Sequence, residues 1–148
     1  MQVVNFYRVA DEYGEFSNFA EYPVRLDGEL WPTSEHYFQA QKFEDATYRQ
    51  RIRKANTPWD AAELGRDRKV KIRRDWESAK VGVMHKALAA KFSQHENLRM
   101  LLLGTGDARL VEHTENDSYW GDGGNGRGRN MLGQRLMRVR TELRGADT

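Results

Sequence analysis

Residues Ser34 to Phe43 read Ser-Glu-His-Tyr-Phe-Gln-Ala-Gln-Lys-Phe, and the rest of the fold is predicted outward from this segment. Successive residues of an α-helix turn by about 100°, so Glu35, Gln39 and Lys42 fall on one stripe. A carboxylate, an amide and an amine on one stripe can transfer protons, donate hydrogen bonds and act as a nucleophile. The same residues on a solvated helix would be ordinary surface chemistry, and spacing alone favours that simpler interpretation.

Strand signals lie on both sides of this segment. Val3 to Val9 predicts a first strand. Tyr22 to Leu26 and Glu29 to Trp31 flank Asp27-Gly28, a dipeptide typical of a tight hairpin. Leu110 to His113 predicts a short strand that returns to the same sheet. We therefore expect one small antiparallel sheet.

Helix signals cover most of the remaining chain. Ser34 is the expected N-cap of the helix that carries Glu35, and Thr57-Pro58 begins a helix that ends at Gly65. Further helices are predicted around Tyr48 and Ile52, over Asp75 to Phe92, over Glu96 to Leu103 with Gly104 closing it, and along Leu132, Leu136, Val139 and Leu143. The predicted fold class is α+β, a predominantly helical single domain over residues 1–148 with a small antiparallel sheet.

Composition limits the chemistry and the compartment. The 148 residues include no cysteine, which excludes disulfides and thiolate metal sites, and the four histidines lack metal-site spacing, so we expect neither a metal nor a cofactor. No segment resembles a signal peptide or a membrane span, so we expect a cytoplasmic protein without a membrane partner. Basic residues gather at 49–54, 66–74 and 127–144, which suits a phosphorylated or polyanionic partner, although most charge runs are solvated helix faces.

The segment from Tyr119 to Asn130 contains five glycines within eight residues. Glycines let backbone N–H groups converge on an anion, so phosphate or ribose recognition is one interpretation and a flexible surface loop is the other. Trp120 and Asp122 favour the first, because they can stack a base and contact a sugar.

Three other residues have two interpretations each. Trp76 follows a basic run and can stack a base, although a core anchor is the commoner role of a tryptophan. Asn18 can bind substrate or complete a turn. His36 lies about a quarter turn off the stripe, where it can orient a neighbour, although each of the four histidines, His113 included, is more simply structural or exposed.

Several motifs, in order over nearly the whole chain, resemble the NADAR (YbiA-like) family. They are Phe16 to Phe19, Trp31 to Phe43, Asp75-Trp76-Glu77 and Glu112 to Gly124. The resemblance implies a YbiA-like fold and a metal-independent hydrolase, an N-glycosidase that cleaves between ribose C1 and nitrogen. It implies catalytic residues Glu35, Lys42 and Asp122, and substrate-binding residues Asn18, Phe19, His36, Gln39, Trp76, Trp120, Gly121, Gly123 and Asn130.

The resemblance implies two substrate classes. One is ADP-ribose on the exocyclic amine of guanine in DNA, in some cases with an antitoxin role beside a DNA ADP-ribosyltransferase. The other is a phosphoribosylaminopyrimidine intermediate of riboflavin synthesis. Both carry ribose on an exocyclic amine, which can open to an imine that Lys42 captures as a Schiff base. Direct displacement with water activated by Glu35 or Asp122 is the alternative mechanism. The basic clusters and tryptophans favour the DNA substrate slightly, and a non-catalytic ADP-ribose or nucleotide-binding module is a further alternative.

Overall fold

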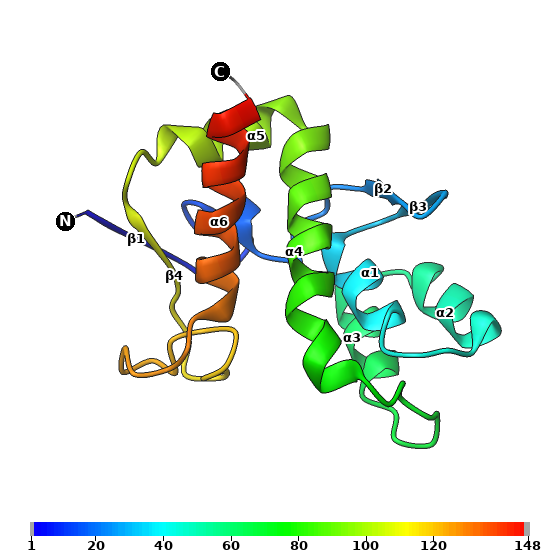
Figure 1. Cartoon of the computed structure of the whole chain (residues 1–148). Helices are drawn as coiled ribbons and strands as arrows, with labels where there is room; N and C mark the ends of the chain where they lie inside the picture. Colours follow the sequence, from blue (N-terminus) through cyan, green and yellow to red (C-terminus); the bar gives the residue numbers. More distant parts are fainter. Residues whose placement is uncertain (1, 147–148) are drawn as a thin grey trace. The chain divides into compact units, whose positions relative to one another are not determined.

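The computed structural model describes residues 2–146, which form six α-helices, one short 3-10 helix and four strands. In chain order these are β1 (Val3–Phe6), η1 (Gly14–Phe16), β2 (Val24–Leu26), β3 (Glu29–Trp31), α1 (Ser34–Ala40), α2 (Ala46–Arg53), α3 (Pro58–Gly65), α4 (Trp76–Gln94), α5 (Glu96–Gly104), β4 (Arg109–Glu112) and α6 (Met131–Ala146) (Figure 1). The expected α+β class with helix predominating is confirmed.

Two compact units make up the chain. The terminal unit comprises residues 1–20 and 92–148, and the central unit comprises residues 21–91. The boundary between them falls within the last turn of α4. The single-domain organisation expected for residues 1–148 stays a prediction.

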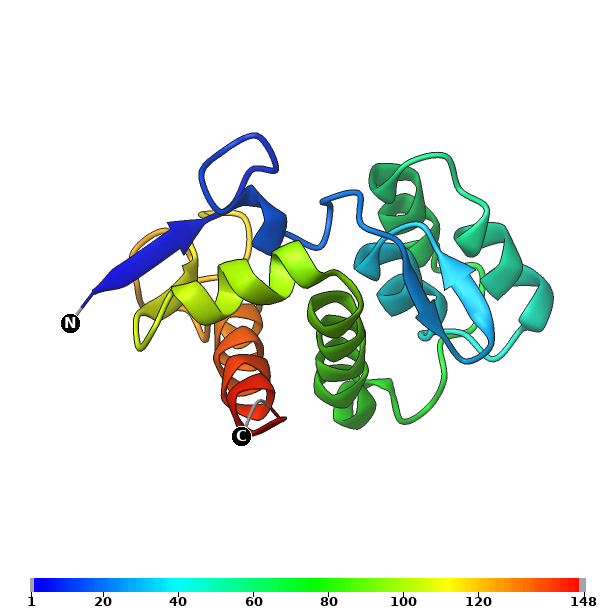
Figure 2. The same ribbon diagram turned by 90° about the horizontal axis from the view of Figure 1, so that it is seen from above.

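The terminal unit is built on a parallel pair of strands. β1 pairs with β4 in a register that runs from Val3 opposite Arg109 to Phe6 opposite Glu112. α6 packs against β4, and both lie beside β1 in Figures 1 and 2. Phe16 of η1 is fully buried, with ring centroids 5.6 Å from Phe6 and 5.7 Å from Phe92. Aromatic packing thus ties the two halves of this discontinuous unit together.

The central unit combines a hairpin with short helices. Asp27 and Gly28 both have positive φ, 55° and 79°, the backbone of a two-residue hairpin turn whose twist matches the strands that it joins. The predicted β2–β3 hairpin is confirmed. α1 packs against α2 and α3, which lie beside it in Figure 2, and the core contains residues of all three helices and of α4.

Two expectations about the strands are wrong. The first strand ends at Phe6 rather than Val9, because the chain turns at once, with Asp11 N–H donating to the Arg8 carbonyl at 3.0 Å. The strand also does not join the hairpin in one antiparallel sheet. It pairs in parallel with β4, so the described residues form two separate two-stranded sheets.

Two expectations about helix ends are also wrong. Thr33, not Ser34, caps α1, because its extended backbone lets its hydroxyl accept from the His36 N–H at 3.1 Å. Gly104 is the last residue of α5 rather than the stop after it. The left-handed backbone position falls instead at Gly106, with a φ of 63°. The expected start of α3 at Thr57-Pro58 and its end at Gly65 are confirmed, and the Thr57 hydroxyl caps the helix by accepting from the Asp60 N–H at 3.0 Å.

Candidate functional site

Helix α1 is buried on every side although only part of it is apolar. All seven residues from Ser34 to Ala40 are buried, and the exposed fractions of Glu35 and Gln39 are 7% each. A solvated surface stripe is therefore the wrong interpretation of this spacing. Polar side chains kept at such burial need partners, or a ligand that completes them.

Glu35 and Gln39 form one buried hydrogen-bonded pair. The Gln39 Nε2 donates to Glu35 Oε2 at 2.7 Å, which joins residues one helical turn apart. The Gln39 Oε1 has no hydrogen-bond partner within residues 2–146. A Cβ on Gly65 would lie 1.9 Å from that oxygen, so the glycine at the end of α3 makes room for the amide.

Lys42 lies just beyond α1, in the turn that follows Ala40. Its backbone N–H donates to the Gln39 carbonyl at 3.2 Å, and its amine interacts electrostatically with Glu35. The Lys42 Nζ lies 6.0 Å from the centre of the Phe38 ring, and its hydrogen bond to the Gly65 carbonyl is long at 3.4 Å. The ammonium group is therefore poorly compensated.

The pKa of Lys42 is lowered, and burial is the largest cause. The positive charges of Arg68, Arg66 and Lys80 lower it further, whereas the charge of Glu35 acts in the opposite direction. A lowered pKa increases the fraction of free amine at neutral pH, and the free amine is the nucleophilic form.

His36 and Trp76 serve the core of the central unit. The His36 Nε2 donates to the Ala55 carbonyl at 3.0 Å, so its Nδ1 is the acceptor for the Thr33 hydroxyl at 2.7 Å. Burial lowers the pKa of His36, which fits this neutral tautomer. Trp76 is 7% exposed and packs on Phe38 with ring centroids 5.1 Å apart. Both side chains therefore support the helix that carries Glu35.

Asp122 organises the glycine-rich loop of the terminal unit. Its Oδ1 accepts from the Thr114 N–H at 3.0 Å and the Gly124 N–H at 2.9 Å, and its Oδ2 accepts from His113 Nδ1 at 2.7 Å. Burial would raise the pKa of Asp122, but the hydrogen bonds from His113 and the two backbone N–H groups together lower it. The carboxylate is thus held ionised.

Asn130 fastens the same loop to β4. Its Oδ1 accepts from the Glu112 N–H and its Nδ2 donates to the Leu110 carbonyl, both at 2.9 Å. Asn130 is 2% exposed and has a φ of 52°. Its amide replaces a neighbouring strand along the free edge of β4. This position is structural, and both polar ends of the amide are used.

The glycines of the loop differ in what they require. Gly123 has a φ of 73°, which favours glycine, whereas a Cβ on Gly121 would lie 2.8 Å from the Asp117 carbonyl. Trp120 and Phe19 are partly exposed and Asn18 is buried. The predicted site residues thus divide between the units. Glu35, His36, Gln39, Lys42 and Trp76 belong to the central unit, and Asn18, Phe19, Trp120, Gly121, Asp122, Gly123 and Asn130 belong to the terminal unit.

Sequence reasoning missed two partners of these residues. His113 was expected to be structural or exposed, and it donates to Asp122 while half of its side chain stays accessible. Gly65 was expected only to end a helix, and it also faces the amide of Gln39. Neither pairing leaves a periodic signal, because each joins residues from different elements.

Residues 2–146 offer neither a cluster of metal ligands nor a membrane-spanning helix. No group of three or more histidine, aspartate or glutamate side chains there is arranged to hold a metal ion. None of the described helices has the length and apolar character needed to cross a membrane.

Comparison with known proteins gives a consistent family relationship. The model of the NADAR domain matches residues 5–144. N-glycosidase YbiA of Escherichia coli (strain K12) is 60% identical over 95% of this chain and 88% of that protein. Riboflavin biosynthesis protein VVA0006 of Vibrio vulnificus is 42% identical over 96% of this chain but only 39% of that protein. The solved NMR structure of E. coli YbiA matches with a TM-score of 0.92 and 57% identity, over 99% of this chain and 87% of that one.

Proposed function

The chain belongs to the NADAR domain family, and we propose that it hydrolyses the bond between ribose C1 and an exocyclic amine. Relatives 60% identical over most of the chain are named N-glycosidase, so the protein is an enzyme of the hydrolase class. The observation that carries the proposal is Lys42, a poorly compensated amine with a lowered pKa beside the buried Glu35–Gln39 pair. Such perturbed groups are typical of active sites.

The chemistry follows from the bond that is cleaved. A ribose on an exocyclic amine can open its ring, which leaves a C1=N iminium. The free Lys42 amine adds to C1, and the bond from C1 to the base nitrogen then breaks as that nitrogen takes up a proton. The product is a Schiff base between Lys42 and C1. Water adds to this imine, Lys42 departs as the amine, and the released sugar closes its ring.

Glu35 is suited to the proton transfers of this sequence. Its carboxylate accepts the hydrogen bond from Gln39 and its charge acts on Lys42, so we propose that it exchanges protons with substrate, water or the Lys42 amine. The negative charge of Glu35 acts to raise the pKa of Lys42, in opposition to burial, so the charge state of one group affects the other. For Asp122 we propose contact with ribose hydroxyls, because its ionised carboxylate accepts hydrogen bonds and lies in the glycine-rich loop.

As physiological substrate we propose ADP-ribosylated guanine in DNA. Basic clusters at 49–54 and 66–74 belong to the same unit as Lys42, which suits a polyanion. This substrate would make the protein an antitoxin partner of a DNA ADP-ribosyltransferase. The second candidate is a phosphoribosylaminopyrimidine, which the name of the Vibrio vulnificus relative favours.

A substrate comparison tests this choice. The purified chain is incubated with guanine-ADP-ribosylated DNA and, separately, with the riboflavin intermediate, and kcat/KM is compared, with Glu35→Gln as the matched background control. We expect the larger value on DNA. Activity on DNA no higher than that of Glu35→Gln would refute the first choice, and affinity without any product would instead support the binding-module alternative.

Borohydride trapping tests the covalent step. Reduction during turnover is expected to leave a sugar adduct on Lys42, identified by peptide mass spectrometry. Lys42→Met should abolish both adduct and turnover, whereas Lys86→Met, at an exposed lysine of α4 outside the basic clusters, should change neither. Efficient turnover by Lys42→Met would eliminate the Schiff base and leave direct displacement.

A further inference from the structure

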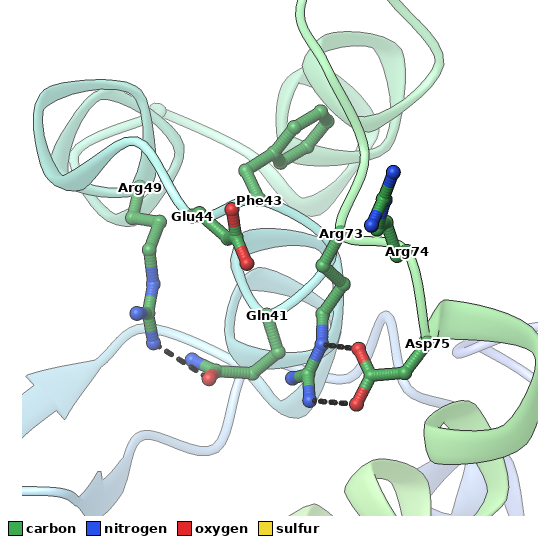
Figure 3. Close-up of a pocket in the computed structure, with 7 residues that line it drawn as sticks. All are labelled: Gln41, Phe43, Glu44, Arg49, Arg73, Arg74 and Asp75. Atoms are coloured by element: carbon green, nitrogen blue, oxygen red, sulfur yellow. Dashed lines mark hydrogen bonds and ion pairs between the residues drawn. The ribbon is translucent and has the colours of Figure 1, made fainter.

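A second group of polar residues surrounds a pocket of about 600 Å³ in the central unit (Figure 3). Its lining residues are Gln41, Phe43, Glu44, Arg49, Arg73, Arg74 and Asp75. The pocket adjoins the proposed catalytic segment through the backbone, because the Arg73 N–H donates to the Lys42 carbonyl at 2.8 Å. The mechanism above uses none of these side chains.

The charges of the pocket are only partly neutralised. Arg73 and Asp75 form a bidentate pair, with Nε–Oδ1 and Nη2–Oδ2 distances of 2.6 and 2.8 Å. Arg74 makes no ion pair or hydrogen bond within the described part of the chain, and the same holds for Glu44. Three guanidinium groups against two carboxylates leave the pocket one net positive charge.

Gln41 adds a buried donor that lacks an acceptor. Its Oε1 accepts from Arg49 Nη2 at 2.6 Å, and a guanidinium can only donate, so this contact fixes which end of the amide is oxygen. The Nε2 of Gln41 is buried and has no partner among residues 2–146, although the residue is 8% exposed and lines the pocket. In Figure 3 the amide lies at the edge of the pocket beside Arg49. A buried donor of this kind is completed by an acceptor on a ligand.

We propose that this pocket binds a single phosphodiester group of a nucleic-acid strand. The free donors are the Gln41 amide, the Arg74 guanidinium and the remaining N–H groups of Arg49, and phosphate oxygens accept from all of them. A phosphodiester carries one negative charge, which matches the net charge of the pocket, whereas a phosphomonoester carries nearly two. The inference rests on the proposed DNA substrate, since only a polynucleotide brings backbone phosphates to the segment beside Lys42.

Glu44 and Arg74 should have opposite effects on phosphate binding, because their charges are opposite. Its carboxylate lines the pocket without an ion pair in residues 2–146, so it repels any anion bound there. Removing this charge must strengthen phosphate binding, and removing Arg74 must weaken it. Both side chains are exposed, so neither substitution disturbs the core.

Fluorescence anisotropy with an unmodified single-stranded oligodeoxynucleotide tests these effects. We expect Arg74→Gln to weaken binding about tenfold and Glu44→Gln to strengthen it about threefold. The slope of log K against log salt should fall by about 0.7 in Arg74→Gln, the value for one phosphate contact on a single strand. Arg25→Gln, at an exposed arginine of β2 outside the pocket, is the matched control and should have little effect.

Measurements of turnover distinguish the phosphodiester site from the proposed glycosidase activity. On an ADP-ribosylated oligonucleotide Arg74→Gln should raise KM, whereas on ADP-ribosylated guanosine, which has no backbone phosphodiester, it should change nothing. Equal losses on both substrates would assign the pocket to a phosphate of the ADP-ribose and overturn the phosphodiester. Unchanged oligonucleotide binding in Arg74→Gln would overturn it as well. If neither substrate is turned over but oligonucleotide binding still depends on Arg74, the proposed function is refuted and the phosphate site is supported.

Discussion

Gly133→Ala is expected to destabilise the protein, although alanine is the better helix former. Gly133 lies in the first turn of α6, where a Cβ would approach the Leu110 carbonyl oxygen at 2.1 Å and the Asn130 amide at 2.5 Å. Real Cβ atoms keep at least 3.0 Å from such atoms, so α6 must move by about 0.9 Å or Asn130 must leave its place. Either change disrupts the contact between α6 and β4.

The size of the loss follows from the hydrogen bonds of Asn130. Two buried bonds of 2.9 Å join its amide to Glu112 and Leu110, and leaving a buried group unpaired costs about 1–3 kcal/mol each. The gain in helix propensity from glycine to alanine is about 1 kcal/mol. The net loss in free energy of unfolding is therefore about 1–5 kcal/mol.

Urea denaturation followed by circular dichroism measures this loss, and Gly82→Ala is the matched control. A Cβ on Gly82, in the exposed middle of α4, would meet no atom within 4 Å, so that variant should gain up to about 1 kcal/mol. With a slope of about 2 kcal/mol per molar urea, the Gly133→Ala midpoint should fall by about 0.5–2.5 M. A Gly133→Ala protein as stable as the parent would refute the close approach of α6 to β4.

Two further predictions concern titrating groups. Arg66→Gln removes a positive charge that lowers the pKa of Lys42, so the pKa of Lys42 should rise in this variant. The ascending limb of the profile of kcat/KM against pH should then move to higher pH. If this limb does not move, the Lys42 amine does not determine it. His113→Gln removes a hydrogen bond that lowers the pKa of Asp122. A carboxyl group with a lowered pKa stabilises the fold at pH values above its unfolded pKa, and this stabilisation is lost as the pH falls through its folded pKa. The His113→Gln variant should therefore be less stable than the parent by up to about 1 kcal/mol near pH 6, and the difference should vanish in acid. Urea titrations at several pH values measure it, and a deficit that persists in acid would exclude this cause.

Local signals predicted the local structure well. The Asp27-Gly28 turn needs two residues with positive φ, and Thr57-Pro58 supplies a cap and a fixed φ, so both could be read without tertiary information. The β1–β4 pair could not, because its strands are about a hundred residues apart and parallel pairing leaves no turn signature. The position of Asn130 could not be predicted either, because its amide takes the place of a strand beside β4.

The helical spacing of Glu35 and Gln39 was predicted correctly, but their environment could not be inferred from the sequence. Four of the seven residues of α1 are polar or charged, at positions 34, 35, 36 and 39, a pattern that predicts an exposed face. Their burial results from α2 and α3, which pack on the helix and whose placement no periodicity in α1 encodes. Burial is also what lowers the pKa of Lys42, so the chemically decisive property is tertiary.

The polar groups along α1 become less well satisfied toward its C-terminal end. His36 uses both ring nitrogens, Gln39 uses its amide nitrogen but leaves Oε1 unpaired, and Lys42 has one long contact at 3.4 Å. A folded chain gains nothing from leaving such groups incomplete, since pairing them would stabilise it. Incomplete groups gathered at one end of an otherwise satisfied helix therefore indicate where a ligand supplies the missing partners. This gradient, rather than the three-residue spacing, is the stronger structural argument that Lys42 meets substrate.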